Sequence, residues 1–225
     1  MIEARSVWLR YTPNSGWVLR GASLRLAPGS IVALMGPNGS GKTSMLKVLA
    51  GLIKPGRGEV LYNGLNIWDM DDARRLEARR TAVYVAEKPV MVRGTVMDNL
   101  LLGLRLRGID PQLAEKRVEW VVESLGLDSI LDMNARSLSA GQAQIVSIAR
   151  ALVLGPKYLL LDEPFPHLDR ARRRLLAGLL EELRSEGVAI AIAGHEEAYT
   201  LRLSDSIAWI ESGIVTMQEP DSVLI

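Results

Sequence analysis

The octapeptide GPNGSGKT at residues 36–43 constrains the fold of this chain more than any other feature. It fits the pattern G-x-x-x-x-G-K-[ST], whose glycines let consecutive backbone N–H groups point into one concavity. The apolar residues 31–35 before it predict a buried strand, and residues 44–50 after it predict a helix whose N-terminus adds a positive dipole. This context predicts a phosphate-binding loop, in which Lys42 reaches the β- and γ-phosphates and the Thr43 hydroxyl ligates Mg²⁺. A glycine-rich turn without a ligand is the alternative.

A second apolar run, at residues 158–161, ends in two carboxylates, Asp162 and Glu163. An aspartate at the carboxyl end of a buried parallel strand, beside a phosphate-binding loop, can hold the hydration shell of Mg²⁺. The next side chain points to the other side of the strand end, where Glu163 can orient or deprotonate an attacking water. Two acids that merely open an exposed turn are the alternative, which the preceding apolar residues disfavour.

A third apolar run, at residues 188–193, is closed by Gly194 and His195. A histidine at the end of a parallel strand lies at the crevice where α/β sheets bind ligands. Its imidazole could donate a hydrogen bond to a γ-phosphate oxygen. For a histidine considered alone, a structural role on the surface or in the core is the commoner interpretation.

Taken in order, these motifs resemble the nucleotide-binding subunit of an ATP-binding cassette (ABC) transporter, and the resemblance covers nearly the whole chain. Residues 36–43 are similar to the Walker A loop of that family, and residues 159–163 are similar to its Walker B strand. Residues 138–142, LSAGQ, resemble the LSGGQ signature. The signature, with the run at residues 144–152, distinguishes the family from P-loop kinases and GTPases.

Three further positions match the family pattern, and two depart from it. Residues 166–169 are similar to the D-loop, His195 matches the switch histidine, and Tyr11 matches the aromatic residue that stacks on adenine; core packing is the alternative for Tyr11. Ala140 replaces the second glycine of the signature, which suits a helix N-terminus if its φ is negative. Glu87 replaces a usual glutamine and brings a charge close to the triphosphate.

The resemblance implies a site shared between two copies of the chain. Glu163, His195 and Lys42 are the implied catalytic residues, and Thr43, Glu87 and Asp162 the implied Mg²⁺ ligands. The implied ATP-binding residues are Tyr11, Gly36, Asn38, Gly39, Ser40, Gly41, Lys42, Thr43, Ser44, Glu87, Ser139, Ala140, Gly141, Gln142 and Asp169. Of these, the residues of the signature and Asp169 would act across the interface, on the nucleotide of the other copy.

The implied function is hydrolysis of ATP to ADP and phosphate, with Mg²⁺, to power solute transport through a separate integral-membrane permease. The second subunit would be another copy or a paralogue, and an extracytoplasmic solute-binding protein is a further implied partner. Residues 87–100 resemble importer subunits, especially those for oxyanions, so import is favoured over export. The chain would lie on the cytoplasmic face of the cell membrane as a peripheral protein. A soluble ABC ATPase that acts on a protein or on cofactor assembly is the alternative.

The predicted fold class is α/β: a P-loop NTPase core with a mainly parallel sheet, an N-terminal antiparallel β-subdomain and an inserted α-helical subdomain. Its 225 residues, 48% of them hydrophobic, suffice for one such domain. We expect residues 1–87 and 155–225 to form the β-subdomain and the nucleotide-binding core, and residues 88–154 to form the helical subdomain with the signature. Helices are expected at 95–106 and 111–126, and a hairpin turn at Asn63-Gly64.

Composition excludes several other classes. The net charge of +1 gives no electrostatic basis for binding nucleic acid, so no such partner is expected. There are no cysteines, which excludes disulfides and thiolate metal sites. No apolar run approaches the ~20 residues of a membrane-spanning helix.

Overall fold

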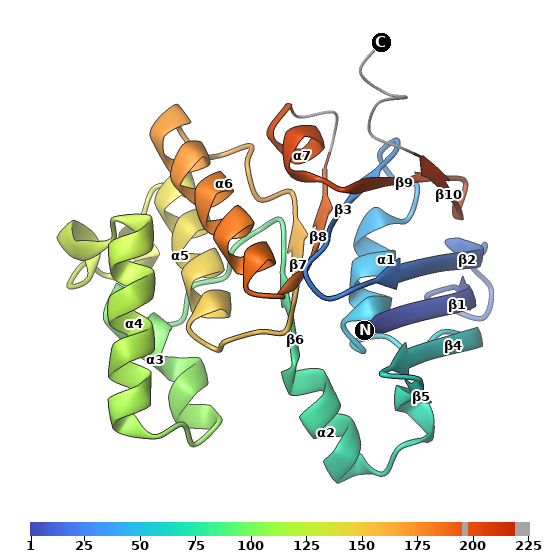
Figure 1. Ribbon diagram of the computed structural model, residues 1–225, viewed down its shortest axis with the longest axis horizontal. Coiled ribbons are helices and arrows are strands. Elements are labelled where there is room, and N and C mark those ends of the chain that lie inside the picture. Colours follow the sequence, from blue (N-terminus) through green and yellow to red (C-terminus); the bar gives the residue numbers. More distant parts are fainter. Residues whose placement is uncertain (195–197, 219–225) are drawn as a thin grey trace.

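The computed structural model describes residues 1–194 and 198–218, which form two sheets and the helices packed around them (Figure 1). The larger sheet has six strands in the order β10-β9-β3-β8-β7-β6. In that order they are Ile214–Gln218, Ser206–Glu211, Ile31–Met35, Ala189–Ala193, Tyr158–Asp162 and Ala82–Val85. All neighbours pair in parallel except β9 and β10, which form an antiparallel hairpin. The predicted, mainly parallel core is therefore confirmed.

The smaller sheet is antiparallel and uses the N-terminal part of the chain, in the order β2-β1-β4-β5. Its strands are β1 (Ile2–Leu9), β2 (Leu19–Leu26), β4 (Arg57–Tyr62) and β5 (Leu65–Asn66). The turn between β4 and β5 has φ values of 50° at Asn63 and 85° at Gly64, both positive as the tight hairpin turn requires.

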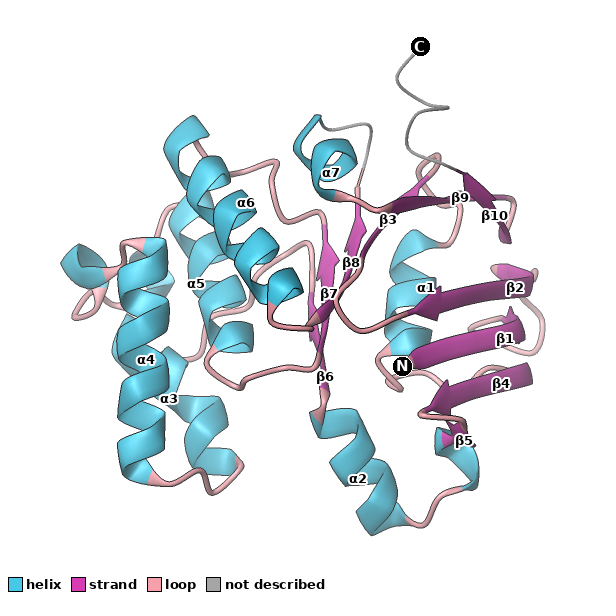
Figure 2. Ribbon diagram, in the orientation of Figure 1, coloured by secondary structure: helices cyan, strands magenta, loops and turns pink. Residues whose placement is uncertain are grey.

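Helix α1 (Lys42–Leu49) lies between the two sheets (Figure 2). Its buried face, which includes Met45, Leu46 and Leu49, belongs to one hydrophobic cluster with the inner residues of the antiparallel sheet and of β7 and β8. The helix begins at Lys42, two residues before the predicted start, because the last glycine of the loop provides its N-cap in a left-handed conformation.

Four longer helices lie on the opposite side of the parallel sheet from α1 (Figures 1 and 2). Three of them follow β6 and precede β7: α3 (Val96–Leu106), α4 (Pro111–Leu125) and α5 (Ala140–Leu152). They share a second hydrophobic cluster with α6 (Arg170–Ser185). Helices near residues 95–106 and 111–126 were predicted. A capping box at Thr95 marks the start of α3, and Gly126, in a left-handed conformation, marks the end of α4.

Helix α2 (Asp72–Arg80) was not predicted from the sequence. It buries none of its residues and carries no apolar stripe, so periodicity cannot reveal it. It begins at an N-cap, where the Asp71 carboxylate accepts a hydrogen bond from the Arg74 backbone N–H, and it ends with Arg79 and Arg80 near its negative pole.

The shorter elements complete the described chain: α7 (Ala198–Leu203) and 3-10 turns at Ile67–Asp69, Asp128–Ile130 and Ala135–Ser137. Among the described helices, none combines the length and the hydropathy needed to cross a bilayer.

Candidate functional site

The loop between β3 and α1 holds a backbone conformation that only glycine adopts readily. Gly36, Gly39 and Gly41 have φ values of 139°, 77° and 114°. A Cβ atom at Gly36 would lie 2.0 Å from the carbonyl oxygen of Ile210 on β9, whereas a Cβ at Gly39 would meet nothing within 4 Å. The glycines of this loop thus serve two purposes: Gly36 allows close packing on the sheet, and Gly39 leaves open space on the solvent side.

Two polar side chains of the loop fit a phosphate ligand. Lys42 is 7% exposed, and its Nζ donates hydrogen bonds to the carbonyl oxygens of Gly36, at 2.7 Å, and Pro37, at 3.1 Å. The Ser40 hydroxyl is buried and has no hydrogen-bond partner among the described residues. Within the described ranges, this buried cation bonds only to neutral carbonyls and lies near an unsatisfied hydroxyl, a combination that matches the chemistry of a phosphate oxyanion.

Tyr11 lies beside this loop and is 56% exposed, so the alternative of core packing is wrong. Its hydroxyl and the Ser44 Oγ form a hydrogen bond of 2.8 Å. Val18, the residue before β2, lines a cavity together with Tyr11 and this loop. Its role was not predicted, since an isolated valine in a loop carries no sequence signal.

The two carboxylates at the end of β7 differ in environment. Asp162 is 3% exposed, and its Oδ2 accepts a hydrogen bond of 2.8 Å from the Tyr84 hydroxyl on β6. Burial, and then the nearby Asp162 charge, raise the pKa of Tyr84, so the phenol stays protonated and donates. Glu163 has a φ of 48°, unusual for a side chain of this size, and its backbone N–H donates to the Ala193 carbonyl at 2.9 Å.

One cavity of about 540 Å³ brings most of the predicted site residues together. The residues that line it are Tyr11, Val18, Asn38, Gly39, Gly41, Lys42, Thr43, Ser44, Glu87, Asp162 and Glu163. The three predicted Mg²⁺ ligands, Thr43, Glu87 and Asp162, are among them, and all three offer the oxygen atoms that Mg²⁺ prefers. Across the described ranges 1–194 and 198–218, no group of three acidic, histidine or cysteine side chains could hold a metal.

The signature turn lies outside this cavity, at the N-terminus of α5. The Ser139 Oγ accepts a hydrogen bond from the Gln142 backbone N–H, and the Gln142 Oε1 accepts one from the Ser139 N–H, which makes a capping box. Ala140 is the first helical residue and is not among the described residues with positive φ. The negative φ that an alanine requires at this position of the signature is therefore present.

The signature also touches the loop that follows β7. A Cβ atom at Gly141 would lie 2.5 Å from the His167 carbonyl oxygen, so only glycine permits this approach. Asp169, predicted to reach the other copy, caps α6 in the single chain: its Oδ1 accepts from the Arg172 N–H at 2.9 Å. His195 lies outside the described residues.

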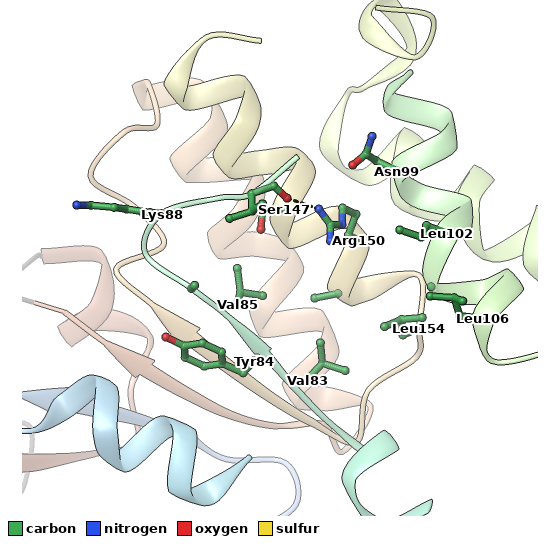
Figure 3. Close-up of a pocket in the computed structure, with 14 residues that line it drawn as sticks. Val83, Tyr84, Val85, Lys88, Asn99, Leu102, Leu106, Ser147, Arg150 and Leu154 are labelled. Atoms are coloured by element: carbon green, nitrogen blue, oxygen red, sulfur yellow. Dashed lines mark hydrogen bonds between the residues drawn. The ribbon is translucent and has the colours of Figure 1, made fainter. Parts of the chain in front are cut away.

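A second hollow, a groove of about 340 Å³, lies between β6 and helices α3 and α5 (Figure 3). Its apolar lining includes Val83, Val85, Leu102, Leu106 and Leu154.

The charged residues of this groove are all cationic: Lys88 and Arg150 line it, and no carboxylate does within the described chain. The Arg150 Nη1 donates to the Val90 carbonyl oxygen at 2.6 Å, and burial lowers the pKa of this guanidinium. None of the ion pairs formed between described residues involves Arg150. Among the described residues, the groove therefore combines an apolar wall with a cation that has no carboxylate beside it in the lining.

Comparison with known proteins decides the family to which this site belongs. Residues 19–166 match the family model described as ABC transporter. The chain belongs to the ABC transporter family.

Relatives in this family cover most of the chain. A provisionally named ABC transporter ATP-binding protein of Pyrococcus furiosus is 37% identical over 96% of this chain and 82% of the relative. A probable anion import ATP-binding protein of Haloferax volcanii is 35% identical over 89% of this chain and 74% of the relative.

Solved ABC structures share the architecture. A dimeric bacterial ABC transporter cassette superposes with a TM-score of 0.86 at 27% identity, covering 98% of this chain and 99% of the other. The same cassette in a post-hydrolysis dimer with ADP and phosphate gives a TM-score of 0.87 at 26% identity, again over 98% and 99% of the two chains. These findings confirm the predicted family, the predicted fold and the ABC-type ATPase class, with ATP as the nucleotide.

Proposed function

We propose that this ABC ATPase is the ATP-hydrolysing subunit of a transporter and drives solute movement through a separate integral-membrane permease. The observation that carries the proposal is the cavity of about 540 Å³, which joins the phosphate-binding loop to the two carboxylates of β7. A nucleotide held by the loop would place its terminal phosphate near a buried aspartate and a glutamate suited to handle water.

Each residue has a role in this proposal. The Lys42 ammonium exchanges its hydrogen bonds to the Gly36 and Pro37 carbonyls for contacts with the β- and γ-phosphates. Tyr11 stacks on the adenine. Glu163 orients or deprotonates the attacking water. Thr43, Glu87 and Asp162 hold Mg²⁺, which neutralises phosphate charge when bound. His195, which lies outside the described residues, keeps its predicted role as a γ-phosphate contact.

The second half of the site comes from another copy of the chain or a paralogue. The Ser139 side chain and the α5 N-terminus are exposed, with backbone N–H groups available to an anion. Because the signature lies outside the nucleotide cavity of its own chain, it would close over the nucleotide of a second subunit. The dimeric cassettes with a similar fold support this arrangement.

The groove between β6 and the helices is the proposed docking site for the permease. Its apolar wall suits a short amphipathic helix, and the half-buried Arg150 suits a carboxylate on that helix. A helix docked there would contact both the nucleotide-binding core and the helical subdomain. We assign the helical subdomain to residues 88–154, within a single domain of residues 1–225. The ATPase would then lie on the cytoplasmic face of the membrane as a peripheral subunit.

We favour import as the direction of transport and an oxyanion as the transported solute. Among the relatives are a probable anion import protein and a phosphate import ATP-binding protein of Natronomonas pharaonis, 34% identical over 90% of this chain and 75% of the relative. An importer would also involve an extracytoplasmic solute-binding protein.

The test uses Glu163→Gln, which removes the water-activating carboxylate and keeps the shape of the side chain. Turnover should fall by roughly 10²–10⁴-fold, while ATP binding persists and the variant elutes as a dimer with ATP and Mg²⁺. A variant that stays monomeric at saturating ATP would contradict the shared site.

Membrane association tests the transport part. Expressed in its host, the chain should sediment with membranes and copurify with a multi-spanning subunit. Recovery only in the soluble fraction, with a protein or cofactor-assembly partner, would favour the soluble ABC ATPase instead.

A further inference from the structure

The side chains of strand β6 pack on opposite faces of the sheet, and one of these faces bears the groove. Val83 and Val85 belong with the hydrophobic cluster of the helical side and line the groove. Tyr84, between them, also lines the groove, but its ring packs against the cluster of α1 and the antiparallel sheet, and Figure 3 shows that ring on the side of β6 away from Leu102 and Leu106. This alternation follows from the two-residue period of a strand.

The Tyr84 side chain ends at the carboxylate of the nucleotide site. Its hydroxyl donates to the Asp162 Oδ2 at 2.8 Å, and its ring lies beneath the Lys47 ammonium of α1, 5.8 Å from the ring centroid. β6 and β7 are paired in parallel, with Tyr84 opposite Leu160, so the backbone register fixes the reach of the phenol. Asp162 is nearly inaccessible to water, so this donor replaces a water molecule that the carboxylate would otherwise bind.

We propose that Tyr84 is a positioning residue for Mg²⁺: its hydroxyl fixes the Asp162 carboxylate and leaves the second oxygen for the hydrated cation. The inference rests on the proposed ATPase function. Hydrogen bonds to a ligating carboxylate orient the ligand, and their loss typically costs 10–100-fold in metal affinity. The strand that provides the donor is also a wall of the groove, so a partner docked there lies one residue from the group that holds Asp162.

The test compares the affinity of wild type and Tyr84→Phe for a fluorescent ATP analogue, with excess Mg²⁺ and with EDTA. The phenylalanine keeps the ring and removes only the donor. We expect the affinity with Mg²⁺ to fall about tenfold, and the affinity in EDTA to stay unchanged. Equal weakening in both conditions would indicate a structural role and overturn the proposal, as would no change in either.

Two further variants make the result specific. Tyr62→Phe is the matched control, because the Tyr62 hydroxyl is also buried but donates to the Leu49 carbonyl oxygen, at 2.7 Å; it should lower the melting temperature without altering the Mg²⁺ effect. In the Asp162→Asn background, Tyr84→Phe should add less than a twofold further loss, and a full tenfold loss there would overturn the proposal. If the wild-type protein binds no ATP in the presence of Mg²⁺, the proposed function fails. If the wild type binds and Tyr84→Phe binds with the same affinity, only the role proposed for Tyr84 is refuted.

Discussion

The phosphate-binding loop and the signature turn both place a glycine sequence before a helix, yet they are built differently. The loop before α1 has left-handed glycines and a lysine that is 7% exposed. The turn before α5 has an extended N-cap at Ser139, closed by its own capping box and open to solvent. The first is shaped to wrap a phosphate within the chain. The second is complete as a helix N-terminus but lies outside the nucleotide cavity of its own chain, which is the basis for the proposal that it acts on the nucleotide of a second subunit.

Gly36→Ala should have the largest effect on stability, because it places a side chain in the phosphate-binding loop, where the backbone conformation favours glycine. The new Cβ would lie 2.0 Å from the Ile210 carbonyl oxygen at a φ of 139°. We expect the free energy of unfolding to drop by on the order of 3–5 kcal/mol, measured by urea denaturation. Gly39→Ala is the matched control: it has the strain of positive φ without the clash, and should cost about 1–2 kcal/mol. Equal effects of the two would show that packing on β9 is unimportant.

Lys42→Ala and Ser139→Arg should each lower ATP turnover by at least about 100-fold, through different halves of the site. Removing the lysine abolishes phosphate binding within one chain. The arginine fills the space in front of the α5 N-terminus and blocks closure of the dimer, so nucleotide affinity should stay near the wild-type value. Fluorescent ATP titration of the monomer distinguishes the two. A parallel loss of affinity in Ser139→Arg would contradict the division between the halves.

Glu87→Gln should raise the Mg²⁺ concentration for half-maximal turnover by about tenfold or less. The reason is that an ionised oxygen holds a hard cation better than an amide oxygen does. A Mg²⁺ titration at fixed ATP measures the shift. An unchanged titration, with equal or faster turnover, would show that phosphate repulsion keeps this exposed carboxylate away from the metal.

Ala140→Gly, which restores the usual signature, should have the smallest effect. The position is helical and exposed, so glycine costs at most about 1 kcal/mol of unfolding free energy. Urea denaturation and ATP turnover are the measurements. A large gain in turnover would mean that the alanine methyl group obstructs the nucleotide of the second subunit, contrary to the relaxed geometry of this turn.

Local sequence predicted those parts of the fold and site that depend on neighbouring residues. The strand, loop and helix at residues 31–49 and the two acids at the end of β7 can be predicted from runs of a few residues. Tyr84 could not be found this way, because its contact with Asp162 joins residues 78 positions apart and depends on strand register. Helix α2 was missed for a different reason: the local features that mark it are caps and charges, and it has no apolar period.

The missing side chain of Gly141 has a mechanical consequence. With the His167 carbonyl filling the space that a Cβ would need, the start of α5 and the segment after Glu163 cannot slide past each other. We expect them to move as one rigid body when two subunits approach. When the signature of one chain approaches the nucleotide of the other, the segment after Glu163 in the first chain would therefore move with it. The two nucleotide sites of the dimer would then be coupled through this direct contact.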